Sequence, residues 1–175
     1  MLQKFLSVIV LAASLQLGIS NKAVAQKGTS YTNAVGMALE VGSDYGTQVG
    51  VSGKHFFNTN SAGEAQVIFG NRLTMINLQY QYHGDIPNAA GLKWVAGFGP
   101  GIAFSKKYTS YSYYDDYYYS SGGGTDVLLR PVVGLDYKVN NVPLNFSFNW
   151  TPAFVVTHGT SFSAARFGFG FRYAL

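Results

Sequence analysis

Residues 164–175 read AARFGFGFRYAL, and this stretch carries the pattern that decides the fold. From Phe167 to Leu175 every second residue is large and apolar, and the residues between them are Gly, Gly, Arg and Ala. Successive side chains of a β-strand point to opposite faces, so this period of two predicts a strand with one oily face and one small or charged face. The fold then depends on which of these faces meets water.

The same alternation recurs along the rest of the chain. Several alternating segments reach about ten residues, which is longer than the usual soluble strand and sufficient for a tilted strand to cross a bilayer. Turn sequences rich in Gly, Asn, Asp and Pro separate them. Together they predict eight antiparallel strands, at about 34–41, 48–52, 64–69, 76–83, 93–104, 126–138, 144–157 and 166–175.

Three prolines fall inside the predicted strands, although a proline has no N–H to give to a ladder. The three are Pro100, Pro131 and Pro152. Each is expected to mark either a bulge or a position beyond the paired region of its strand.

The number of large apolar residues decides which face points outward. A closed eight-stranded barrel has room inside for only about twelve side chains, far fewer than the apolar faces of these strands carry. A two-sheet sandwich would bury more of them, but its other face would then be the water surface. That face is mostly Gly, Ala, Ser, Asn and Gln, and charged residues are only 11% of the chain. The pattern therefore favours a transmembrane barrel with apolar residues outside and small or polar residues inside.

The N-terminal segment has the features of a secretory signal. Lys4 precedes an apolar run, and Ala23-Val24-Ala25 forms a cleavage site, so residues 1–25 are predicted to be a signal peptide and 26–175 the barrel. Removing Lys4 and Lys22 from the formal net charge of +4 leaves +2, which gives no reason to expect nucleic-acid binding. The chain contains no Cys, so it has neither disulfides nor thiolate metal ligands.

With its signal peptide, eight alternating strands and C-terminal FGFGFRYAL, the chain resembles the small outer-membrane β-barrels of Gram-negative bacteria, the OmpA transmembrane-domain and OmpX-like family. The resemblance implies a bacterial outer-membrane location, with lipid and lipopolysaccharide as surroundings. It also implies that the barrel-assembly machinery reads the last strand as a signal, here Phe167, Phe169, Phe171, Tyr173 and Leu175. Leu175 departs from the usual terminal aromatic residue. The peptidoglycan-binding module of full-length OmpA is not expected after Leu175.

The resemblance places both termini in the periplasm and residues 105–125 outside the cell. Within that loop, SYSYYDDYYYSS favours a hairpin turning at Asp115-Asp116, with Tyr111 opposite Ser120. Tyr and Ser are also frequent in binding loops. We therefore expect contact with a surface ligand or a membrane-protein partner through Tyr108, Tyr111, Tyr113, Tyr114, Tyr117, Tyr118 and Tyr119, with an extended hairpin that has no binding role as the alternative. Lys106 and Lys107 at its base are either solvated or bound to lipopolysaccharide phosphates.

The predicted inner face collects most of the charged residues, and a charge there is costly unless it is paired. We expect a network that fills the lumen, formed by Glu40, Lys54, Glu64, Lys93, Arg130, Asp136, Lys138, Arg166 and Arg172. The alternative is a narrow ion path that is gated by rearrangement of these pairs. Tyr80, Tyr82, Trp94, Tyr137 and Trp150 are candidates for the aromatic belts at the membrane surfaces.

No enzyme, metal or cofactor site is expected. A grouping of His158, Ser161 and either Asp126 or Asp115 is weak evidence for catalysis, because such roles depend on geometry. A lipid-modifying barrel would also need an apolar pocket, whereas this lumen reads as polar. The sequence thus predicts a structural or surface-interaction barrel, with a narrow gated channel or an accessory subunit of a larger outer-membrane complex as the alternatives.

Overall fold

The computed structural model describes residues 31–43, 46–71, 73–112, 117–121, 123–157 and 161–175, and for 108–112 and 117–121 only the backbone. The predicted signal peptide therefore lies outside the described residues. In the described part the regular elements are all strands, and no helix there is long and apolar enough to span a bilayer.

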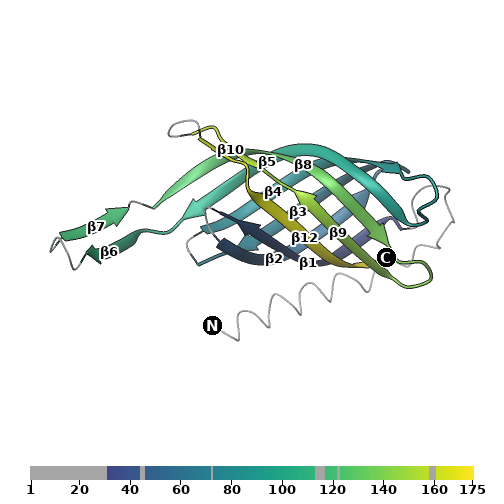
Figure 1. Ribbon diagram of the computed structural model, residues 1–175, viewed down its shortest axis with the longest axis horizontal. Coiled ribbons are helices and arrows are strands. Elements are labelled where there is room, and N and C mark those ends of the chain that lie inside the picture. Colours follow the sequence, from purple (N-terminus) through teal and green to yellow (C-terminus); the bar gives the residue numbers. More distant parts are fainter. Residues whose placement is uncertain (1–30, 44–45, 72, 113–116, 122, 158–160) are drawn as a thin grey trace.

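The strands form one closed barrel and one separate hairpin (Figure 1). Neighbouring strands are antiparallel and follow one another in the sequence, and β1 closes the sheet by pairing with β12. The elements are β1 (Asn33–Gly42), β2 (Gly46–Phe56), β3 (Ser61–Phe69), β4 (Leu73–Asp85), β5 (Leu92–Ser105), β6 (Tyr108–Ser112), β7 (Tyr117–Ser121), β8 (Gly124–Lys138), β9 (Leu144–Trp150), β10 (Ala153–Val155), β11 (Ser161–Ser163) and β12 (Arg166–Ala174).

The predicted eight-stranded up-and-down barrel is confirmed. The segments β9–β10 and β11–β12 are each one predicted strand, interrupted after Trp150 and after Ser163, and β6–β7 is an extension outside the barrel. β9 pairs with β8 on one side and with β12 on the other, so the ring is continuous.

Large apolar side chains cover the outside of this barrel. Met37 and Phe98 are each 62% exposed, and Phe167, Phe169, Phe171 and Tyr173 on β12 are all between 42 and 49% exposed. The alternate residues of the same strand, Arg166 and Arg172, are at most 2% exposed. The structure therefore confirms that the apolar face points outward and the polar face inward. The outer surface suits hydrocarbon rather than water.

Two of the three prolines share one interruption of the sheet. The β8–β9 pairing at Val133–Trp150 resumes as β8–β10 pairing in the same register, so Pro131 and Pro152 lie opposite each other in the unpaired stretch. Two residues without an N–H thus occupy the same gap, which limits the loss of ladder bonds to one place. Register is kept across this gap, so the expected bulge is absent between these two strands.

The third proline, Pro100, also causes a gap without a bulge. The β4–β5 register is the same at Asn77–Gly101 and at Tyr80–Phe98, and only the two pairs between them are missing. A bulge does occur on the other side of β9–β10. There, Trp150 pairs with Phe167 and Ala153 with Ser163, which leaves one extra residue at 164–165 on the β11–β12 side.

The outward face of β12 offers a direct test of its surroundings. Phe169→Arg, in the middle of the strand, is expected to cost about 2–4 kcal/mol of unfolding free energy in lipid vesicles, because a charge is least tolerated at the bilayer centre. Tyr173→Arg, on the same face near the strand end, is expected to cost about 1 kcal/mol or less. Urea unfolding measures both values, and equal costs would mean that this face does not lie in a bilayer.

Candidate functional site in the barrel lumen

The lumen holds two groups of buried charged side chains. We call the end of the barrel where β1 begins and β12 ends the terminal end, and the end that carries the β6–β7 hairpin the loop end. The terminal-end cluster consists of Lys54, Glu64, Asp136 and Arg172, and the loop-side cluster of Glu40, Arg130 and Arg166. Seven of the nine residues that the sequence predicts for a lumen network therefore lie in these clusters.

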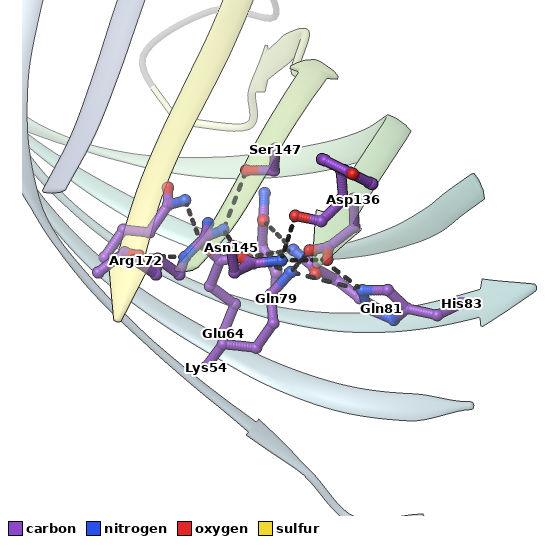
Figure 2. Close-up of polar contacts among 12 residues, drawn as sticks. Lys54, Glu64, Gln79, Gln81, His83, Asp136, Asn145, Ser147 and Arg172 are labelled. Carbon is purple, nitrogen blue, oxygen red and sulfur yellow. Dashed lines mark hydrogen bonds and ion pairs between the residues drawn. The ribbon is translucent and has the colours of Figure 1, made fainter. Parts of the chain in front are cut away.

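The terminal-end cluster alternates cations and anions from four strands (Figure 2). The Lys54 ammonium lies 2.7 Å from Asp136 Oδ2 and 3.4 Å from Glu64 Oε2. The Arg172 guanidinium pairs with the other oxygen of Glu64. All four side chains are at most 3% exposed, so the pairs are shielded from water and from salt.

Neutral side chains complete the bonding of this cluster. Gln81 donates to Glu64 Oε2 at 2.8 Å, and Asn145 donates to Asp136 Oδ1 at 2.5 Å. Arg172 donates to Ser52, Asn145 and Ser147 at 2.7–3.1 Å. Buried charges are tolerated when their remaining hydrogen bonds are made, and here side chains of β2, β4 and β9 make them.

Tyr31 closes the cluster toward the terminal end. It precedes β1, and its hydroxyl donates to Asp136 Oδ1 at 3.3 Å. Burial and the neighbouring Asp136 carboxylate raise the pKa of the Tyr31 phenol well above its ordinary value, so the phenol keeps the proton that it donates.

His83 is a further member that a search for charged residues misses. Its Nε2 lies 3.4 Å from the Lys54 ammonium and 3.8 Å from Asp136 Oδ2, and its ring packs 4.8 Å from that of Phe56. The available signal was its place after Asn77, Gln79 and Gln81 on the polar face of β4. All four of these side chains are buried.

The loop-side cluster joins β1 to its neighbour β12 and, across the lumen, to β8. Both oxygens of Glu40 accept bonds from Arg130, at 2.9 and 3.1 Å, and Arg166 donates to Glu40 and to Gln48 at 2.9 Å. Arg130 also donates to the Thr151 carbonyl at 3.1 Å, beside the gap that Pro152 leaves in the sheet. The Arg130 guanidinium thus makes a hydrogen bond to a backbone carbonyl that lies in the unpaired stretch of the sheet.

The remaining two predicted network residues lie apart from both clusters. Lys93 pairs with Asp85, whose side chain is 68% exposed, at the terminal mouth. Lys138 donates to the Val139 and Val142 carbonyls of the following turn. Both residues alternate inward, but they lie so near the strand ends that their long side chains reach the rim.

One wall of the loop-end half differs from the polar lumen that the sequence predicts. Residues that we call the apolar layer pack together there from β3, β4, β5 and β8, and each is at most 5% exposed: Ile68, Leu73, Met75, Ala103 and Leu128. Two of them, Ile68 and Leu128, are visible in the sequence as apolar exceptions on a polar face. The expectation of a wholly polar lumen is therefore wrong for this wall.

The β6–β7 hairpin confirms the predicted ribbon but not its register. Tyr111 pairs with Tyr118 rather than with Ser120, and the last pair is Ser112–Tyr117. The connection therefore spans 113–116 instead of the two residues 115–116, which shifts the pairing by two residues and keeps the same residues on each face. Tyr113 and Tyr114 lie outside the described residues, as do the side chains of Tyr108, Tyr111, Tyr117, Tyr118 and Tyr119.

The described residues do not bring together a catalytic group of the kind that the sequence weakly suggested. His158 and Asp115 lie outside them, Ser161 is exposed, and Asp126 accepts a hydrogen bond from Thr157 at 3.0 Å. In that same part of the chain, no three His, Asp or Glu side chains are placed to hold a metal ion.

The contribution of the buried pairs to stability is measurable. Glu40→Gln removes the carboxylate that both Arg130 and Arg166 contact, and is expected to cost about 3–5 kcal/mol of unfolding free energy because it leaves buried positive charge uncompensated. Lys138→Met, at the partly exposed turn, is the control and is expected to cost less than about 1 kcal/mol. Urea unfolding in lipid vesicles compares the two, and similar small losses would show that the loop-side cluster is not important for stability.

Comparison with known proteins bears on the fold. No protein-family model and no curated sequence matches the chain. Among solved structures, the barrel is similar to the N-terminal β-barrel domain of Pseudomonas aeruginosa OprF, with a TM-score of 0.54 and 17% sequence identity. The match covers 82% of this chain and 99% of that domain. The chain therefore shares the closed β-barrel fold of that domain.

Proposed function

We propose that the protein is a small integral barrel of the bacterial outer membrane that serves as a closed scaffold and presents the β6–β7 hairpin to a partner at the cell surface. Three features support this: the apolar outer face, the paired charges that fill the lumen, and the hairpin that extends from one end. The hairpin is the observation that carries the interaction role.

The hairpin continues the barrel wall away from the expected membrane region. β5 and β8 pair without interruption up to Ser105–Gly124, and β6 and β7 pair again from Tyr108–Ser121. Figure 1 shows the hairpin at the end of the molecule opposite the C-terminus. The ribbon therefore carries a Tyr- and Ser-rich sequence, the composition of many binding loops, beyond the end of the barrel.

The lumen favours a scaffold over a channel. An eight-stranded barrel is only wide enough for side chains to fill. Here the two ion-pair clusters connect strands across the lumen, and the apolar layer occupies part of the loop-end wall. A conducting path would require several buried pairs to break at once.

The same face pattern supports the proposed membrane location. Backbone groups of a closed barrel are satisfied within the sheet, and an outward apolar band with aromatic residues at its edges fits a bilayer. Trp94 and Tyr82 pack together at 5.6 Å near the terminal end, where such a belt is expected. Lipid and lipopolysaccharide are then the immediate surroundings, and the alternating β12 aromatics are the segment available to the barrel-assembly machinery.

Deletion of residues 108–121 tests the interaction role. Because Ser105 and Gly124 are paired, the deletion leaves 106, 107, 122 and 123 as a short connection that a β-hairpin tolerates. The shortened barrel is expected to fold, as judged by heat-modifiable migration on gels, and to lose the partner or surface attachment of the full chain. Binding is measured by pull-down from native membranes and by attachment of cells that display the protein.

The control is the double variant Lys106→Ser and Lys107→Ser, which keeps the hairpin and removes the two positive charges beside it. If the control binds normally and the deletion does not, the hairpin makes the contact. If the deletion and the full chain capture the same proteins and attach equally well, the proposed interaction role is wrong.

A further inference from the structure

His83 is the only histidine that the described residues place inside the barrel. Its side chain is fully buried, whereas His55, the other histidine of the described residues, is exposed on the outer face. The backbone of His83 is fixed, because its N–H donates to the Asn60 carbonyl and its carbonyl accepts from the Asn60 side chain, both at 2.7 Å. The ring is thus held against the terminal-end cluster (Figure 2).

The contact between His83 and Lys54 shows the protonation state of the ring. Lys54 Nζ lies 3.4 Å from His83 Nε2. An ammonium has only hydrogens to donate, so Nε2 accepts and the proton of the neutral ring is on Nδ1. A protonated ring would carry N–H groups on both nitrogens and would direct one of them at the ammonium. The observed arrangement therefore requires a neutral His83.

The surroundings of His83 are balanced in charge when the ring is neutral. The terminal-end cluster contains two cations and two anions, and protonation of the ring adds a third cation. The side chains that face His83 or its charged neighbours are Lys54 on β2, Glu64 on β3, Asp85 on β4, Lys93 and Val95 on β5, Asp136 on β8, Arg172 on β12 and Tyr31 before β1. Among them, Asp136 is the carboxylate nearest to the ring, at 3.8 Å from Nε2.

From this geometry we propose that the terminal-end cluster is an acid-responsive switch, in which protonation of His83 moves Asp136 from Lys54 to His83. Asp136 Oδ2 lies 2.7 Å from Lys54 Nζ and 3.8 Å from His83 Nε2, so a small movement exchanges the partners. Lys54 then keeps only Glu64, which Arg172 already contacts. The exchange weakens the ion pair that connects β2 with β8 on the opposite side of the ring.

The sign of the pH dependence follows from the folded and unfolded chains. A histidine in the unfolded chain gains its proton near pH 6.5, whereas the folded barrel disfavours that proton because Lys54 contacts Nε2. Unfolding therefore takes up a proton. The equilibrium constant for unfolding should rise as the pH falls below about 6.5, by at most about tenfold per pH unit. Carboxylates of the unfolded chain gain protons mainly below about pH 4.5, so the interval from pH 6.5 to 5 reports on histidine.

Urea unfolding in lipid vesicles between pH 7.5 and 5 tests the role of His83. His83→Gln keeps an oxygen that can accept from Lys54 but cannot gain a proton, so the rise of the unfolding constant is expected to disappear. His55→Gln is the matched control on the outer face and is expected to keep the rise. An equal rise in His83→Gln and in the wild type would overturn the proposal.

Lys54→Met tests the exchange of partners itself. Without the ammonium, the cluster has two anions and one cation, and protonation of His83 restores the balance by pairing with Asp136. The unfolding constant of this variant is therefore expected to fall as the pH falls from 6.5 to 5, opposite to the wild type. Lys138→Met removes a lysine charge at the turn and should keep the wild-type direction. A Lys54→Met protein with the wild-type direction would contradict the exchange.

A measurement that leaves the cluster intact decides the question if a cluster variant does not give a heat-modifiable barrel. The double variant His55→Gln and His158→Gln leaves His83 as the one histidine of the chain. In nanodiscs at pH 7.5, the ¹⁵N spectrum of its ring should show a protonated Nδ1 and an unprotonated Nε2, and acid should protonate Nε2. A proton on Nε2 at pH 7.5 would overturn the proposal.

Discussion

A chain in hydrocarbon must satisfy each backbone polar group from within its own sheet, and this constraint accounts for most of the structure. It requires the sheet to close, as it does where β1 meets β12. It also explains why the irregular places are compensated: the two prolines that remove N–H groups share one gap, and Arg130 bonds to the Thr151 carbonyl beside it. The lumen side chains thus fill the interior, and one of them also bonds to backbone in a gap of the sheet.

The same constraint determines where charge is found. With the outer face committed to apolar residues, charged side chains are confined to the lumen, the mouths and the loops. Inside, the clusters include pairs between strands that are not neighbours in the sheet: Glu40 on β1 with Arg130 on β8, Glu64 on β3 with Arg172 on β12, and Lys54 on β2 with Asp136 on β8. The Lys54–Asp136 pair joins strands on opposite sides of the ring, which favours a rigid scaffold from which the hairpin is presented.

Sequence reasoning recovered the barrel because the period of two is a local property that burial on one side enforces along the strand. It also identified the inward charges, since only a strand's alternation was needed to place Glu40 or Arg172. It did not predict which charges meet, because partners depend on the stagger between strands and on how far a long side chain reaches. Lys93 and Lys138 have the correct face but lie too near the rim to join the clusters.

The apolar layer and the hairpin register escaped prediction for a different reason. Ile68 and Leu128 appeared as isolated exceptions in separate strands, and only closure of the sheet brings them together with Leu73, Met75 and Ala103. The hairpin register depends on the length of its connection, for which Tyr-rich sequence on both sides offers several equivalent pairings. The first feature is tertiary, whereas the second depends on a local connection, and both lie at the loop end.

The most direct test of the account is the accessibility of nitroxide labels on the outer face in lipid vesicles. Labels at Phe148 and Phe169 should collide readily with oxygen, which concentrates in hydrocarbon, and weakly with a water-soluble nickel chelate. A label at Val142, in the exposed turn after β8, should show the reverse. If the labels at Phe148 and Phe169 respond to the nickel chelate as strongly as the label at Val142, the outer face is not in lipid and the account is wrong.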